Sequence, residues 1–80
     1  MADQEQVERV RTIIASVFRA SASQLPAEPD QNNVKGWDSL NHLRLILALE
    51  AGLKVRFRTD RIPRLTSLGA IVDELDAYGR

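Results

Sequence analysis

The chain has 80 residues, 44% of them hydrophobic and 28% charged, which favours one small soluble domain over residues 1–80 and excludes a disordered or fibrous chain. A domain this short buries only about 60% of its unfolded surface, so a deep substrate cavity would weaken it, and the length argues against a self-sufficient enzyme. Eleven basic residues cancel eleven acidic ones, so the net charge does not indicate a partner. The absence of cysteine and the single histidine exclude disulfides and thiolate metal sites and argue against a histidine metal cluster.

No apolar run approaches the roughly 20 residues of a membrane span, and the acidic start of the chain is unlike a signal peptide. We therefore expect a cytoplasmic protein that does not engage a membrane. Charge is nevertheless uneven, because residues 54–64 hold five basic residues against Asp60 alone. Such a segment suits nucleic acid, a phosphate-bearing ligand or an acidic protein surface, and it is equally typical of a solvated loop.

The first element is a helix predicted over residues 3–20, where apolar residues recur at helical spacing: Val7, Val10, Ile13, Ile14, Val17 and Phe18. Residues 21–38 are rich in Ser, Pro, Asn and Gly, which predicts a long loop held by apolar anchors such as Leu25 and Val34. Connections longer than about 12–15 residues are uncommon in compact domains and are usually functional. We therefore expect a functional site near the end of this loop.

A second helix is predicted from Ser39 to about Gly52, with Asp38 as its N-cap. Its polar residues scatter around the helix, and residues 45–49 are all apolar. A helix that is apolar on several sides is either enclosed by its neighbours or leaves apolar surface for a ligand or partner. In so small a domain, we favour the second alternative, in which the helix leaves apolar surface free.

After the second helix, Val55 and Phe57 alternate with arginines, but no partner strand is apparent, so we expect a loop with apolar anchors. A short helical turn is predicted around residues 59–62, ended by Pro63. Thr66 resembles the N-cap of a last helix with helical apolar spacing and with Asp73 and Glu74 on its solvent side. The predicted fold is all-α, a small bundle of three main helices plus a short helical turn, with a long loop between the first and second helices.

Ser39 opens the second helix and has three interpretations. It could simply belong to the helix cap beside Asp38. A hydrolase is poorly supported, because residues 36–40 lack the strand and second glycine of a nucleophile elbow, and His42 reads as an exposed helix histidine without an orienting carboxylate. The third interpretation is a tether, since the N–H groups and dipole at a helix N-terminus would stabilise a phosphodiester on the serine oxygen.

Residues 36–50 read Gly-Trp-Asp-Ser-Leu-Asn-His-Leu-Arg-Leu-Ile-Leu-Ala-Leu-Glu and resemble the modification motif and second helix of acyl carrier proteins. The resemblance continues to residues 65–72, which are similar to the approach and start of the family's final helix, so essentially the whole chain is covered. It implies that Ser39 receives 4′-phosphopantetheine from coenzyme A through a phosphopantetheinyl transferase and that the arm's thiol holds acyl groups as thioesters. The chain itself would catalyse nothing. Asp38 would cap the helix beside the transferase chemistry, and Leu40 would pack under the arm or meet a partner enzyme.

The resemblance also implies partners and a place for the acyl chain. The partners would be the transferase, a loading ligase or acyltransferase, and downstream acyl-processing enzymes acting on a monomeric, free-standing carrier. The acyl chain would fold back between the second, third and fourth helices. The corresponding apolar residues here are drawn from Leu43, Leu47, Ile62, Leu65 and Ala70.

The second helix departs from the family pattern, which is usually acidic there, because Glu50 is its only acid. The partner surface predicted instead is polar or basic and consists of Asn41, His42, Arg44, Arg56, Arg58 and Arg61. Charge complementarity then predicts partners with less basic or acidic docking surfaces, in a specialised lipid, polyketide or secondary-metabolite pathway. Lys54 stands where the family often has a helix-ending glycine and Gly52 lies two residues earlier, which predicts an early end to the helix. Gly-Trp before the motif favours the acyl over the peptidyl branch.

The alternative is an unmodified helical module that binds protein or nucleic acid through residues 54–64. The neutral net charge and the lack of a basic recognition helix count against nucleic acid. Modification separates the two hypotheses, because nucleic-acid binding would weaken steeply with salt and would survive Ser39→Ala.

Overall fold

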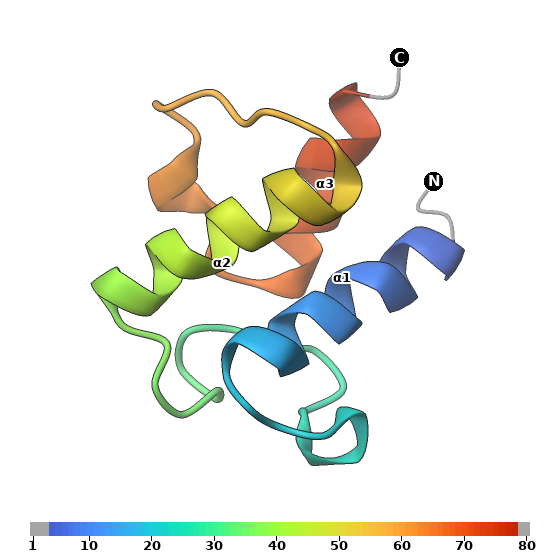
Figure 1. The fold of residues 1–80 in the computed structure, drawn as a ribbon, viewed down its shortest axis with the longest axis vertical. Helices are drawn as coiled ribbons and strands as arrows, with labels where there is room; N and C mark the ends of the chain where they lie inside the picture. Colours follow the sequence, from blue (N-terminus) through green and yellow to red (C-terminus); the bar gives the residue numbers. More distant parts are fainter. Residues whose placement is uncertain (1–3, 79–80) are drawn as a thin grey trace.

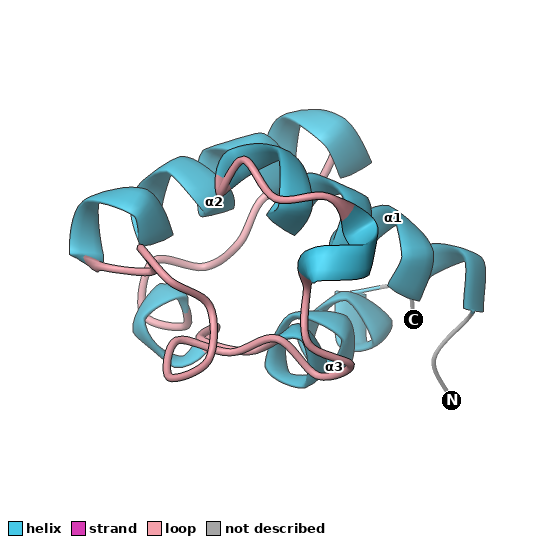
Figure 2. Cartoon of the chain, turned by 90° about the horizontal axis from the view of Figure 1, so that it is seen from below, coloured by secondary structure: helices cyan, strands magenta, loops and turns pink. Residues whose placement is uncertain are grey.

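The computed structural model describes residues 4–78, apart from the side chain of residue 22, and over this range the chain is helical (Figure 1). Figure 2 shows helices and loops with no strand in the described part of the chain. The predicted fold class is therefore confirmed. The elements in chain order are α1 (Gln4–Val17), the short 3₁₀ helix η1 (Ala22–Gln24), α2 (Ser39–Leu53), the short 3₁₀ helix η2 (Ile62–Arg64) and α3 (Leu68–Tyr78).

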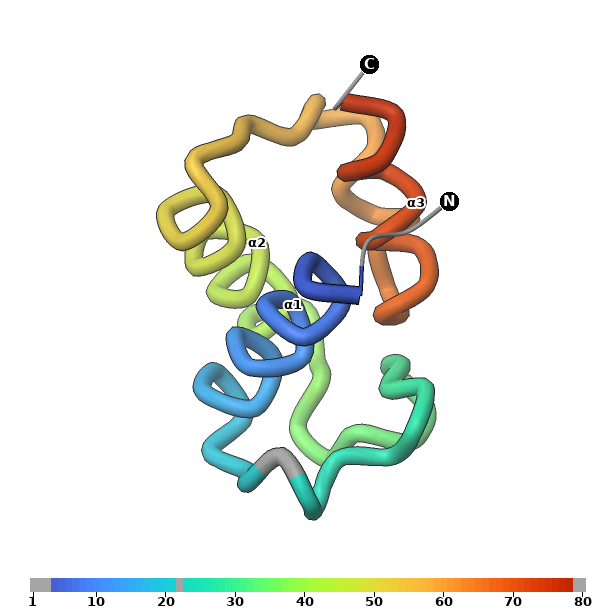
Figure 3. The backbone as a smooth tube through the Cα atoms, turned by 90° about the vertical axis from the view of Figure 1, so that its right-hand side faces the viewer, coloured from blue at the N-terminus to red at the C-terminus, as the bar shows by residue number. Residues whose placement is uncertain are grey.

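Helix α1 is the centre of the bundle and packs against both α2 and α3. Figure 3 shows α1 lying between the other two helices. The side chains removed completely from solvent come from all three helices and from the long loop, and include Val10, Ile14, Leu45, Leu49, Ile71 and Pro29. The helical spacing of apolar residues in the sequence thus corresponds to one shared core.

The long loop between α1 and α2 is anchored as predicted, since Leu25 and Val34 are buried. It is also fixed to the start of α3, because the Gln31 N–H donates to the Thr66 carbonyl at 3.0 Å and the Leu68 N–H donates to the Pro29 carbonyl at 2.9 Å. These two bonds form an isolated antiparallel β-bridge between Asp30 and Ser67. The loop therefore closes one end of the bundle before it reaches α2 (Figure 3).

The helix ends differ from the sequence expectations in several places. Helix α1 was expected to reach residue 20 but ends at Val17, because Arg19 adopts a left-handed φ of 55°. The first residue predicted for this helix, residue 3, lies outside the described residues. The early end of α2 at Gly52 is also wrong, since the helix continues to Leu53 and Lys54 itself takes the left-handed position with φ 56°.

The segment before α3 needs two further corrections. A turn forms at residues 59–61, where the Arg61 N–H donates to the Arg58 carbonyl at 2.9 Å, but it leads directly into η2. Pro63 is the second residue of η2 rather than a terminator, since a proline in the first turn of a helix forfeits no hydrogen bond. The cap predicted at Thr66 belongs to Ser67, whose Oγ accepts the Ala70 N–H at 3.0 Å. The loop with apolar anchors is confirmed, as Phe57 is buried and residues 55–58 form no strand.

Glu74 was predicted on the solvent side of α3 and is instead buried, whereas Asp73 is exposed. The Arg61 guanidinium bonds the Glu74 carboxylate at 3.1 Å, which compensates for the burial of its charge. Periodicity could not reveal this pairing, because Arg61 lies 13 residues away in a connecting segment. Among the described residues, no helix is long and apolar enough to span a membrane.

Candidate functional site

Ser39 is the first residue of α2, and its side chain is exposed. The predicted cap is confirmed: Asp38 is extended, and its Oδ1 accepts the Asn41 N–H at 2.9 Å. The Asn41 side-chain amide donates to the Gly36 carbonyl at 2.8 Å, and Gly36 has a φ of 91°, which side chains rarely adopt. This hydrogen-bonded turn fixes the position of Ser39, whose own hydroxyl has no hydrogen-bond partner among residues 4–78.

A groove of about 510 Å³ lies beside Ser39, between the first turns of α2 and the segment that contains η2. Figure 1 shows this segment turning back along α2 towards its N-terminal half. The groove is apolar along much of its length and is lined by Gln31, Trp37, Asp38, Ser39, His42, Leu43, Ile62, Pro63 and Thr66. An exposed serine hydroxyl thus borders a sheltered, partly apolar surface.

His42 was expected to be an exposed helix histidine, and the structure contradicts this. Its ring is half-buried, accepts the Trp37 indole N–H at Nδ1 over 3.0 Å, and lies 2.8 Å through Nε2 from the Ile62 carbonyl. Because Nδ1 accepts, the hydrogen-bond network assigns the proton to Nε2, which donates to Ile62. Trp37 is buried, its indole is inclined by 24° to the His42 ring, and it contacts Phe18 at 5.2 Å between ring centroids.

Helix α2 presents three leucines to solvent, one helical turn or two apart: Leu40, Leu43 and Leu47 are 60%, 53% and 64% exposed. Leu45, Ile46 and Leu49 face the core instead. The apolar residues around α2 therefore divide into a buried face and an exposed stripe. This division confirms the expectation that α2 leaves apolar surface free.

The residues predicted as a partner surface differ in their surroundings. Arg44 and Arg56 are exposed and form no ion pair within the described part of the chain. Arg58 is paired with Asp60 at 3.1 Å, and Arg61 is paired with Glu74. The Asn41 and His42 side chains are bonded within the protein, as described above. The only acid of α2, Glu50, accepts the Phe57 N–H at 2.9 Å, so the exposed stripe of α2 has Arg44 beside it and no uncommitted carboxylate of its own helix.

The five residues that were predicted to line one acyl pocket lie in different places in the structure. Leu43 and Ile62 line the groove beside Ser39. Leu47 faces solvent, and Leu65 is core, 2% exposed. Ala70 and Leu65 border a separate hollow of about 260 Å³ on the Glu74 side of η2. Trp37, Pro63 and Thr66 line the groove but were not predicted to, because the folding of two loops onto α2 brings them there.

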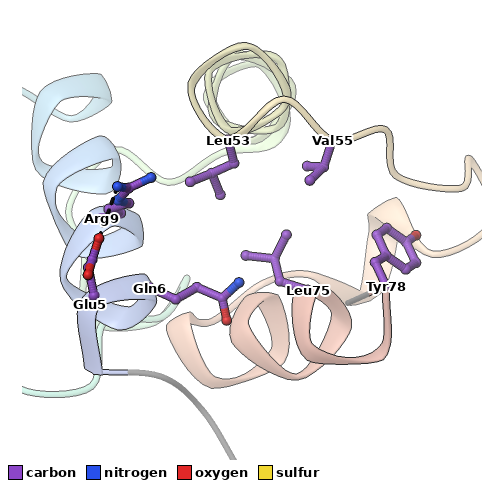
Figure 4. A pocket seen from close by; sticks show the side chains of 7 residues that line it. All are labelled: Glu5, Gln6, Arg9, Leu53, Val55, Leu75 and Tyr78. Atoms are coloured by element: carbon purple, nitrogen blue, oxygen red, sulfur yellow. Dashed lines mark hydrogen bonds and ion pairs between the residues drawn. The ribbon is translucent and has the colours of Figure 1, made fainter. Parts of the chain in front are cut away.

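A second hollow, of about 330 Å³, lies where the start of α1, the end of α2 and the end of α3 meet (Figure 4). It is lined by Glu5, Gln6, Arg9, Leu53, Val55, Leu75 and Tyr78. The Tyr78 hydroxyl accepts the Arg58 backbone N–H at 3.1 Å, and burial raises the pKa of this phenol, with a smaller contribution from Glu74. Because Ser39 is at the other end of α2, this hollow is remote from the groove.

A curated relative, an acyl carrier protein of Guillardia theta, is 30% identical to this chain over 73 residues, which cover 91% of the chain and 90% of that protein. No protein-family model matches the chain. The identity extends over nearly the whole of both sequences, and the all-α fold agrees with it. The chain belongs to the acyl carrier protein family.

Proposed function

We propose that this protein is an acyl carrier in which Ser39 bears a 4′-phosphopantetheine arm received from coenzyme A through a phosphopantetheinyl transferase. The observation that carries the proposal is the exposed, unbonded hydroxyl of Ser39 at the start of α2, in a chain of this family. The transfer forms a bond from Oγ to phosphorus, releases adenosine 3′,5′-bisphosphate and removes the serine proton. When bound, the arm supplies a thiol that holds acyl groups as thioesters.

The surroundings of Ser39 fit a phosphodiester. The Asp38 side chain and carbonyl occupy the N–H groups of Asn41 and His42, while those of Ser39 and Leu40 have no intrahelical acceptor and lie at the positive end of the helix dipole. A phosphate on Oγ can be stabilised there. The adjoining groove offers Leu43, Ile62 and Trp37 to a partly apolar arm.

The partner enzymes would dock on the exposed leucine stripe of α2 and the cations beside it. Leu40 and Leu43 follow Ser39 within the first turns of α2, and Arg44 and Arg56 are exposed cations that form no ion pair among the described residues. This surface fits a loading enzyme whose docking site is apolar with an acidic rim. It supports service in a specialised lipid, polyketide or secondary-metabolite pathway.

The experiment is intact-mass measurement after incubation with coenzyme A, magnesium and a broad-specificity phosphopantetheinyl transferase. We expect one phosphopantetheine per chain in the wild type and none in Ser39→Ala. Ser16→Ala is the matched control, because Ser16 is an exposed serine on α1, and this variant should be modified like the wild type. An unmodified wild type beside a carrier protein that the same transferase modifies would contradict the proposal, as would a modified Ser39→Ala.

A further inference from the structure

His42 joins three segments that are separate in sequence. Its Nδ1 accepts a hydrogen bond from the indole N–H of Trp37 at the end of the long loop, and its Nε2 donates to the Ile62 carbonyl of η2, 20 residues further on. Within the described residues, the bond from His42 to Ile62 is the hydrogen bond that links α2 to η2. Both ring nitrogens are used, so the imidazole is held in one orientation.

This ring lies at the boundary between the groove and the core. The groove lining contains one buried residue, Trp37, and its other members are half-buried or exposed. None of the core leucines of α2 belongs to the lining. Leu45 and Leu49, which follow His42 on the same helix, are fully buried against the bundle. No lining residue of the groove belongs to α3 or to the buried face of α2, so the groove does not continue into the core.

Resting on the proposed function, we propose that His42 is a specificity-determining residue that keeps the carried acyl group on the surface and so favours short acyl groups over long alkyl chains. A long chain gains stability in proportion to the apolar area it buries, and this requires a dry passage into the core. Here the bond from His42 to Ile62 joins α2 to η2 at the wall of the groove, where such a passage would have to open. Opening it would leave the Ile62 carbonyl and the Trp37 N–H without partners unless water replaced the imidazole.

The inference is tested by loading the protein with butyryl- or dodecanoyl-phosphopantetheine from the corresponding acyl-coenzyme A and measuring thioester cleavage by hydroxylamine. In the wild type we expect the two thioesters to react within about twofold of each other, because both stay exposed on the surface. In His42→Ala we expect dodecanoyl cleavage to fall at least about fivefold relative to butyryl, since the chain can then enter between α2 and η2. His42→Gln, which keeps a donor near the Nε2 position, should restore the wild-type ratio.

A second readout needs no acyl group and separates a gate from a merely structural residue. Trp37 is the only tryptophan, so its indole N–H gives one NMR signal. That signal should move on His42→Ala, and the wild-type histidine should show the tautomer with its proton on Nε2. Protection of the dodecanoyl thioester in the wild type, an unchanged ratio in His42→Ala, or the opposite tautomer would overturn the inference alone. Failure of every acyl-coenzyme A and of coenzyme A itself to modify the chain would overturn the proposed function and this inference with it.

Discussion

Asp38 fixes the position of Ser39, the proposed attachment residue, through a hydrogen bond to the neighbouring backbone. Its carboxylate accepts the Asn41 N–H and fixes the first turn of α2, on which Ser39 stands. We expect Asp38→Ala to lower the free energy of unfolding by about 1 kcal/mol, because an N-cap is lost. Asp38→Asn should stay close to the wild type, since asparagine caps equally well. Urea denaturation measures both, and an equal loss in the two variants would show that charge rather than capping stabilises this turn.

Glu74 is the buried carboxylate of α3, and its negative charge is compensated by the ion pair with Arg61. Arg61→Met removes the partner and leaves a buried charge, so we expect a loss of about 1–3 kcal/mol in the free energy of unfolding. Arg58→Met is the matched control, because the pair of Arg58 with Asp60 is exposed on both sides and such pairs contribute about 0–1 kcal/mol. Equal losses in the two variants, by thermal or urea denaturation, would contradict the role given to Glu74 burial.

At the scale of the elements, α2 has a buried face and an exposed leucine stripe. Substitutions of Leu49 on the buried face and Leu47 on the exposed stripe test whether the two faces differ in their contribution to stability. Leu49→Ala should lower the free energy of unfolding by about 2–5 kcal/mol, because Leu49 is fully buried. Leu47→Ala should change it by less than about 0.5 kcal/mol, because Leu47 is 64% exposed. If Leu47 belongs to the docking surface, the same variant should be loaded more slowly by its partner enzyme. A large stability loss in Leu47→Ala would contradict this division of α2.

The helices and their caps could be predicted from sequence because they depend on local spacing and neighbouring residues. In the apolar repeats of α1 and α3 and in the Asp38 cap, the residues that act together are only a few positions apart in the chain. The burial of Glu74 and the bonding of His42 could not be predicted, because their partners lie 13 and 20 residues away in the segment between α2 and α3. Trp37, Pro63 and Thr66 in the groove lining were missed for the same reason, whereas Leu43 and Ile62 were predicted. Ser39 as the attachment residue stays a prediction from the motif around it.

For the molecule as a whole, the bundle has a different pocket at each end: the groove beside Ser39 and the hollow beside Tyr78. Burial raises the pKa of Tyr78 above the value of about 10 for an unfolded chain. The folded state thus favours the neutral phenol, and this contribution to stability is complete below about pH 10 and is lost as pH rises through the folded pKa.

Because Tyr78 is the only tyrosine, ultraviolet absorbance follows its ionisation alone. We expect a midpoint above 10 in the folded protein and a return to about 10 in denaturant. Tyr78→Phe should remove the corresponding decline in stability at alkaline pH, measured as the difference from the wild type across the same pH range. A folded-state midpoint at or below 10 would contradict the burial of this hydroxyl.

The proposed function depends on one atom, the hydroxyl oxygen of Ser39, so the decisive experiment locates the group that the transferase adds. The wild-type protein is treated with coenzyme A and the transferase, digested, and analysed by tandem mass spectrometry. We expect phosphopantetheine on Ser39 and on no other residue. Attachment to a different residue, or no attachment beside a carrier protein that the same transferase modifies, would contradict it.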